Sequence, residues 1–150
     1  MPYHVELKTV AAQMIAAIRI RSAIEHLSRD IPPACGEVWE FVKANRIAGA
    51  GKLVAIYWDN EMNLEVGVEV GQTFAGNDRV ICSSLPAGLV ATTVHWGPYS
   101  GLGAAHAAVQ KWCKDHGHEP IRPCWELYGH WTDDPSQLRT DVFYLLGGGA

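Results

Sequence analysis

The sequence predicts an α+β fold in which one antiparallel sheet carries two helices on a single face. Short β-branched runs bounded by turn residues alternate with two longer stretches whose apolar residues recur at helical spacing. The order strand, helix, strand, strand occurs twice along the chain. We therefore expect residues 1–150 to form a single domain of two β-α-β-β halves, approximately residues 1–75 and 76–150, related by a pseudo-twofold axis.

Composition fits this expectation and excludes some functions. A chain of 150 residues with 48% hydrophobic and 19% charged residues is long enough to bury a sizeable core. The net charge is −4 and there is no Lys/Arg block, which argues against direct binding of nucleic acid or a membrane surface. The first residues lack the charged-then-apolar layout expected of a signal peptide, and no apolar run approaches the ~20 residues of a membrane span. We expect a cytoplasmic protein whose partner is a small molecule or another protein.

The cysteines predict neither a zinc ribbon nor a redox motif, because none of the four lies in a C-x-x-C pair. They are Cys35, Cys82, Cys113 and Cys124. Each is expected to be a small buried apolar residue. The triplet Cys113-x-x-His116-x-His118 straddles a helix end at Gly117 and has no second pair of ligands, so we expect no metal and no cofactor.

The first half begins with two apolar runs, Val5–Leu7 and Met14–Ile20, which predict one broken strand or two short ones. A helix is expected to begin at Ile31-Pro-Pro, because proline is tolerated in a first turn. Apolar residues follow at helical spacing, with Trp39 beside them. Glycines at 49 and 51 end the helix, and Leu53–Trp58 is predicted to be a strand.

The next predicted strand shows strict alternation from residue 63 onward. Its apolar residues are Leu64, Val66, Val68 and Val70, and its other residues are Asn63, Glu65, Gly67 and Glu69. This pattern is typical of an antiparallel strand with one buried and one solvated face.

The second half repeats the pattern with a clearer helix. Its predicted strands are Arg79–Ser83, Leu89–Trp96, Cys124–His130 and Thr140–Leu146. Between them, apolar residues from Leu102 to His116 recur at helical spacing and stop at Gly117. Tyr57 and Tyr128 occupy matching places in the strand after each helix. Their correspondence supports the repeat.

Several motifs of the second half resemble those of the GyrI-like small-molecule-binding family, which includes effector-binding domains of bacterial AraC-type and BmrR-type multidrug-sensing regulators. They are Leu85-Pro-Ala-Gly88, His95-Trp-Gly-Pro-Tyr99, Leu102, Trp112, Gly117 and Pro123-x-Trp-Glu-x-Tyr128. The resemblance implies a duplicated β-α-β-β fold of the SHS2 type. It also implies a central cleft, lined by aromatic rings around a glutamate, that binds bulky lipophilic and often cationic compounds. Arg122 departs from the pattern, since a glycine commonly precedes the proline.

By the Glu-x-Tyr motif, the resemblance assigns the glutamate to Glu126 and its tyrosine to Tyr128. In a strand these two residues share a face with His130. Tyr57, in the matching strand, is the expected ring across the cleft. Further candidates are Trp39 and Trp96.

Alternatives remain open for each of these residues. Glu126 could be exposed at a sheet edge, or paired with Arg122 or Arg139. The two tyrosines could be core residues with satisfied hydroxyls. His95 and His106 are interpreted as structural, because no Ser or Cys nucleophile has a recognisable motif near them.

Three functions follow from different classes. The first is a stand-alone protein that binds or senses lipophilic, cationic aromatic molecules. The second is implied by the resemblance, because some members of that family open reactive cyclopropane rings: a hydrolase of such genotoxins, with Glu126 as general base and Tyr128 or Tyr57 as proton donor. The third is a protein-binding role such as gyrase inhibition. The sequence favours a cleft but does not separate binding from turnover.

Overall fold

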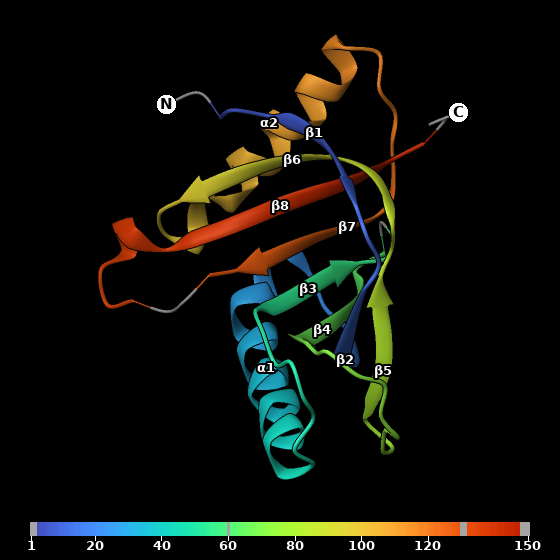
Figure 1. Ribbon diagram of the computed structural model, residues 1–150. Helices are drawn as coiled ribbons and strands as arrows, with labels where there is room; N and C mark the ends of the chain where they lie inside the picture. The colour runs from blue at the N-terminus through green and yellow to red at the C-terminus, as the bar shows by residue number, and fades with distance from the viewer. Residues whose placement is uncertain (1–2, 60, 130–131, 148–150) are drawn as a thin grey trace. The chain divides into compact units, whose positions relative to one another are not determined.

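The computed structural model describes residues 3–59, 61–129 and 132–147 (Figure 1). The elements follow in the order β1 (Glu6–Val10), β2 (Gln13–Arg21), η1 (Ile24–His26), α1 (Leu27–Ala44), β3 (Leu53–Tyr57), β4 (Asn63–Glu69), β5 (Val80–Leu85), β6 (Gly88–Trp96), η2 (Tyr99–Gly101), α2 (Leu102–Asp115), β7 (Pro120–Tyr128), η3 (Pro135–Gln137) and β8 (Arg139–Leu146). The predicted α+β class is confirmed. Within the described ranges, no helix is long and apolar enough to cross a membrane.

The chain forms two compact units. The N-terminal unit spans residues 12–86, and the C-terminal unit combines residues 1–11 with 87–150. These bounds differ from the expected division near residue 75. The reason is strand pairing, since β5 pairs with β2 and β1 pairs with β6, so the first strand belongs with the second half of the chain.

The two units have the same topology. The N-terminal unit holds the antiparallel strand order β3-β4-β2-β5, and the C-terminal unit holds β7-β8-β6-β1. In each unit a β-α-β-β segment supplies three strands and the helix, and a further strand pairs with its first strand. The predicted order is therefore present twice. Its origin by duplication and the pseudo-twofold axis stay predictions.

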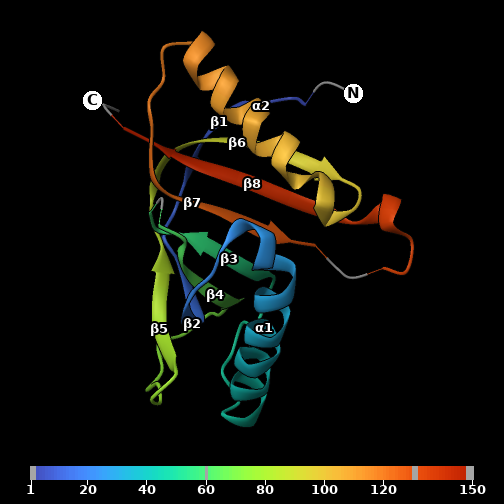
Figure 2. The ribbon, with the colours of Figure 1, turned by 180° about the vertical axis from the view of Figure 1, so that it is seen from behind.

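Each helix covers one face of the sheet in its own unit. Val38 and Val42 of α1 pack into a core with Ile18 of β2 and Val68 of β4. In the C-terminal unit α2 lies along β8 (Figure 2), with Val109 fully buried on its inner side. Amphipathic stripes of this kind bury one side of a helix against a sheet.

Two local expectations were wrong. Helix α1 begins at Leu27, not at Ile31, and it keeps Pro32 and Pro33 inside its second turn. Proline marks a tolerated position in a helix start, so it does not fix the first residue.

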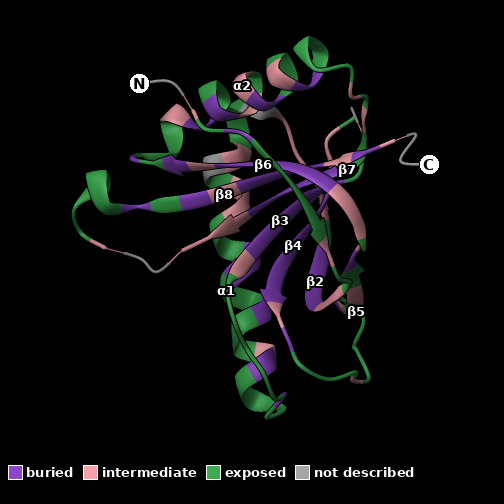
Figure 3. Ribbon diagram, turned by 45° about the horizontal axis from the view of Figure 1, so that its top comes forward, coloured by how far each residue is buried: buried purple, intermediate pink, exposed green. Residues whose placement is uncertain are grey.

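The second error concerns Glu65, which was expected on a solvated face but is only 5% exposed. Glu65 accepts hydrogen bonds from Ser83 Oγ and, at 3.3 Å, from Arg19 Nε. Strand β4 is paired on both sides, and its residues from Leu64 to Val68 are all buried (Figure 3). Both of its faces are therefore covered, although the sequence alternates.

Candidate functional site

The candidate site lies on the face of the C-terminal sheet that α2 covers. Strand register pairs Glu126 with Val142, Tyr128 with Thr140, and Cys124 with Tyr144. Paired residues of an antiparallel ladder point to the same face. This face carries Glu126, Tyr128 and Tyr144 towards α2, which presents His106 to them.

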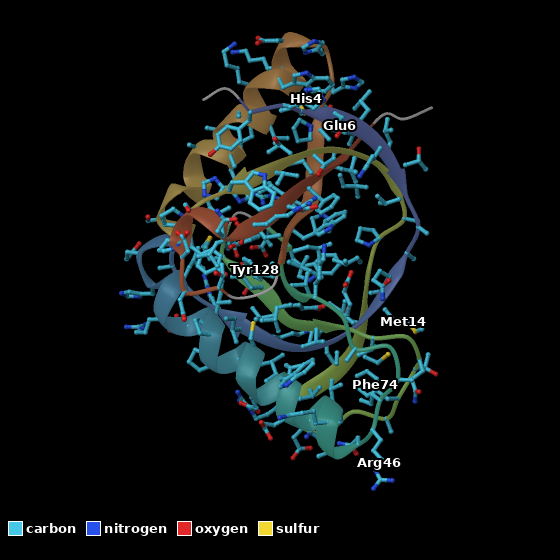
Figure 4. All side chains as sticks on the ribbon, turned by 60° about the vertical axis from the view of Figure 1, so that its left-hand side comes forward. His4, Glu6, Met14, Arg46, Phe74 and Tyr128 are labelled. Carbon is cyan, nitrogen blue, oxygen red and sulfur yellow. The ribbon has the colours of Figure 1, made fainter. Side chains whose placement is uncertain are left out.

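Glu126 is buried, with 4% of its surface exposed, and both of its carboxylate oxygens accept hydrogen bonds. The Oε1 atom accepts from the Tyr128 hydroxyl at 2.5 Å, and Oε2 lies 2.6 Å from His106 Nε2. Tyr128, labelled in Figure 4, is half-buried at the end of β7. A carboxylate out of water is costly unless such donors surround it. The two partners therefore offset part of the cost of burying Glu126.

The hydrogen bonds continue beyond His106. Its Nδ1 atom lies 2.7 Å from the hydroxyl of Tyr144, which also accepts from Gln110 Nε2 at 3.1 Å. Burial raises the pKa of Tyr144 far above the ordinary value for a tyrosine, so the phenol keeps its proton. With Gln110 donating to it, Tyr144 can donate to Nδ1, which leaves the Nε2 proton of a neutral His106 for Glu126. In this series of hydrogen bonds each group thus donates to the next, from Gln110 through Tyr144 and His106 to Glu126.

Aromatic rings surround these polar groups. Tyr99 in η2 meets Tyr128 edge-on, with ring centroids 5.7 Å apart, and is itself 40% exposed. His106 meets the ring of Tyr144 edge-on at 5.5 Å. Within the described residues, Thr140 Oγ1 is a buried polar atom without a hydrogen-bond partner, directly across the ladder from Tyr128. The face therefore combines a carboxylate, several rings and an unused hydroxyl.

The structure rules out two alternatives for Glu126. It is not exposed at a sheet edge, because it is buried. It is not the partner of Arg139, which binds Asp141 through Nε at 2.8 Å and Nη2 at 3.2 Å. Arg122 donates from Nη1 to Cys124 Sγ at 3.1 Å.

Trp96 does not join Glu126, which corrects its choice as a site ring. Register pairs Trp96 with Arg139, and odd-numbered residues of β8 face away from Val142 and Glu126. Trp96 is 58% exposed, and the Arg139 guanidinium lies 5.6 Å from its ring centroid. Alternation along β6 thus sends it to the opposite face.

Two of the remaining candidates belong to the N-terminal unit. Tyr57 is 8% exposed at the end of β3, and Trp39 is 38% exposed on α1, both in the N-terminal unit. Their role as rings opposite Glu126 stays a prediction. His130, expected to share the face of Glu126, falls outside the described residues. His95 is held by Tyr3 OH at 2.8 Å and by Pro98 O at 2.9 Å.

Sequence reasoning missed His106 and Tyr144 as members of the site. His106 directly follows Ala105 in the apolar stripe of α2, where an inward-facing imidazole needs a polar partner. Tyr144, Val142 and Thr140 are spaced two residues apart along β8, so all three face the same side of the sheet. These two signals together could have identified a buried polar pair on the inner face.

In the described ranges, no group of three or more His, Cys, Asp or Glu side chains is arranged to hold a metal ion. His116 and His118 instead stack on Trp112, with ring centroids at 4.2 and 5.6 Å. Cys113 is fully buried on the inner side of α2.

The sequence model of the GyrI-like small molecule binding domain matches residues 3–146, and the chain belongs to that family. No curated protein matches the chain at a significant level.

Solved structures share the fold over nearly the whole chain. The EcmrR C-terminal domain is 21% identical, with 97% of this chain and 98% of that chain covered and a TM-score of 0.81. SAV2435 bound to tetraphenylphosphonium is 12% identical, with 99% and 95% covered and a TM-score of 0.69. A hydrolase from Listeria innocua is 14% identical, with 98% and 94% covered and a TM-score of 0.62. At these identities the likeness establishes the fold alone.

Proposed function

We propose that this domain binds bulky lipophilic cations, with Glu126 as the counter-charge and neighbouring aromatic rings as the binding surface. The observation that carries the proposal is a carboxylate that is 4% exposed and bonded to an imidazole and a phenol. Such donors stabilise a carboxylate without cancelling its charge when both are neutral. A ligand cation would complete the neutralisation in a setting that weakens electrostatic interactions less than water does.

A ligand must displace a side chain to reach Glu126, because so little of the carboxylate is exposed. Tyr128 is the best candidate, since it is half-buried and its hydroxyl covers Oε1. Rotation of this ring would open one carboxylate oxygen and leave His106 on the other. Rings of Tyr128 and Tyr99 would then contact the cation, at about 0.5–2 kcal/mol for each cation–π contact. Tyr57 and Trp39 are kept as further ring candidates.

The comparisons support this class of ligand. The family is described by small-molecule binding, and SAV2435 was solved with tetraphenylphosphonium, a lipophilic cation without hydrogen-bond donors. EcmrR carries a domain of this fold at its C-terminus. For the present chain, we propose a multidrug- or toxin-binding role, as a sensor or as a scavenger.

The test compares two ions of similar shape and opposite charge. Tetraphenylphosphonium at about 100 times its Kd should stabilise the native state by about 2.7 kcal/mol. At about 2–4 °C per kcal/mol for a chain of this size, Tm should rise by about 5–11 °C. Tetraphenylborate at the same concentration should give no comparable rise.

The variant Glu126→Gln keeps the size and hydrogen-bonding capacity of the side chain but removes its charge. We expect the variant to lose most of its affinity for tetraphenylphosphonium. Its affinity for a neutral relative, triphenylphosphine oxide, should fall little. Equal binding of the phosphonium by both proteins would remove Glu126 from the proposal. No binding by the wild type would refute the proposed function altogether.

A second candidate is the hydrolase, which the hydrogen bonds to Glu126 favour, because they fix the orientation of a buried carboxylate that would act as the general base. Glu126 would take a proton from water as the water oxygen attacks a cyclopropane carbon next to the ring carbon that carries a carbonyl group. The strained C–C bond breaks, its electron pair moves to the carbonyl oxygen, and Tyr128 or Tyr57 donates the proton that completes the product. Many turnovers of a ring-opened, water-added product would support hydrolysis. Protection at one equivalent per protein, without product, would support binding alone.

A further inference from the structure

His106 is placed so that either of its protonation states has hydrogen-bond partners. In the neutral state Tyr144 donates to Nδ1, and Nε2–H donates to Glu126. In the cationic state both nitrogens carry protons, and the Tyr144 oxygen must accept from Nδ1. The Tyr144 proton can then turn to Cys124 Sγ, which also lies within its hydrogen-bonding reach. Gain or loss of one proton therefore requires only rotation of a hydroxyl.

Several elements pack against His106 or the groups that it contacts. They are β7 and β8, which contribute its hydrogen-bond partners, together with β6 and η2, which also contact α2. The titratable or charged groups that these elements present on this face are Glu126, Tyr128, Cys124, Tyr144, Tyr99 and His95, with Arg122 bonded to Cys124. Among these groups Glu126 is the one carboxylate, and it touches His106 directly at 2.6 Å. The charge of His106 is therefore coupled most strongly to Glu126.

We propose that His106 makes cation binding at Glu126 proton-linked, so that a cationic ligand expels one proton from His106 to the solvent. The proposal rests on the proposed function and specifies how that site is regulated. A protonated His106 is an internal cation that already neutralises Glu126. A ligand cation at the same carboxylate meets repulsion from it, so the ligand binds best when the imidazole is neutral. A neutral ligand meets no such competition.

Linkage fixes the sign of the effect. Because the cation binds the deprotonated form of His106 more tightly, the Kd of the cation falls as pH rises and the imidazole loses its proton. One linked proton changes Kd by up to about tenfold per pH unit. His106 thereby acts as a specificity-determining residue, because at low pH it weakens the preference of the site for cationic over neutral ligands.

The test is calorimetric titration of the wild type with tetraphenylphosphonium in buffers of different ionisation enthalpy, repeated across about pH 5 to 8. Heat that varies with the buffer reports protons released. We expect release of up to one proton and a Kd that falls with pH, whereas triphenylphosphine oxide releases none. The wild type alone can therefore overturn the proposal, if the cation binds without proton release and with a flat pH profile.

The matched variant is His106→Gln, whose amide nitrogen can still donate to Glu126 but does not titrate. It should bind the phosphonium with a flat pH profile and retain the preference for the cation over the neutral ligand. A wild-type pH slope in His106→Gln would overturn the role of His106. His106→Asn serves the same purpose if the first variant does not fold. Loss of cation preference in Glu126→Gln, with a pH-independent wild type, would keep the proposed function and refute this proposal; no binding at any pH would refute both.

Discussion

Tyr144→Phe removes the hydroxyl that connects Gln110 to His106 and leaves the buried ring in place. Tyr144 is 5% exposed, and its oxygen contacts both neighbours at 2.7 and 3.1 Å. Gln110 is exposed, so water can replace its lost partner. His106 Nδ1 is on a side chain that is 20% exposed, and it loses its partner in a largely covered setting. We expect a loss of about 1–3 kcal/mol of unfolding free energy, and a fall in Tm of about 2–12 °C.

Urea unfolding of Tyr144→Phe and Gln110→Ala measures this difference. Gln110→Ala also removes one hydrogen bond to Tyr144, but it leaves the Tyr144 hydroxyl on His106, so its cost should stay below about 1 kcal/mol. Nitrogen NMR of the imidazole supplies a second measurement, since Tyr144→Phe should weaken the preference of neutral His106 for the Nε2–H tautomer. Equal stabilities for the two variants, together with an unchanged tautomer, would refute the inferred direction of the hydrogen bonds.

Two further predictions concern the cysteines and the opposite face of the C-terminal sheet. Burial raises the pKa of Cys35 to about 11 and also raises the pKa values of Cys113 and Cys124. At about pH 8, iodoacetamide should therefore modify the exposed Cys82 first. Mass spectrometry that shows another thiol alkylated first in the native protein would contradict this. Trp96→Ala should leave the affinity for tetraphenylphosphonium unchanged in the calorimetric titration. It should cost less than about 1 kcal/mol of unfolding free energy in urea, because it removes an exposed contact with Arg139. A large loss of affinity would instead assign Trp96 to the site.

The order and type of the main elements could be predicted from local patterns. The stripe from Leu102 onward gave α2 nearly to its ends, since Gly117 follows it and adopts a positive φ of 75°. Strand partners could not be predicted in the same way. Nothing in the local pattern of β1 indicates that it pairs with β6, because long-range pairing depends on register and burial rather than on the sequence of one strand.

Glu65 illustrates a related limit. Alternation along β4 indicates which residues share a face, but it does not indicate whether water reaches that face. Arg19 and Ser83 come from strands β2 and β5, and only their pairing brings both to the carboxylate. The polar residue was correctly assigned to a face, while its burial depended on tertiary contacts.

The same reasoning explains why half of the candidate site could be anticipated. Glu126 is conspicuous in the sequence because it is a charge within an apolar strand, and Tyr128 follows from alternation. His106 is inconspicuous, since one histidine in a helical stripe is compatible with many structural roles. Its distinguishing property arises only when α2 packs on the C-terminal sheet and brings Nε2 to 2.6 Å from a buried carboxylate. A carboxylate alone would attract a cation at any pH above its own titration, whereas a carboxylate that shares its charge with an imidazole attracts the cation in competition with a proton. In the proposed site the functional unit is therefore the pair, and the proposed pH dependence is a property that neither residue would have alone.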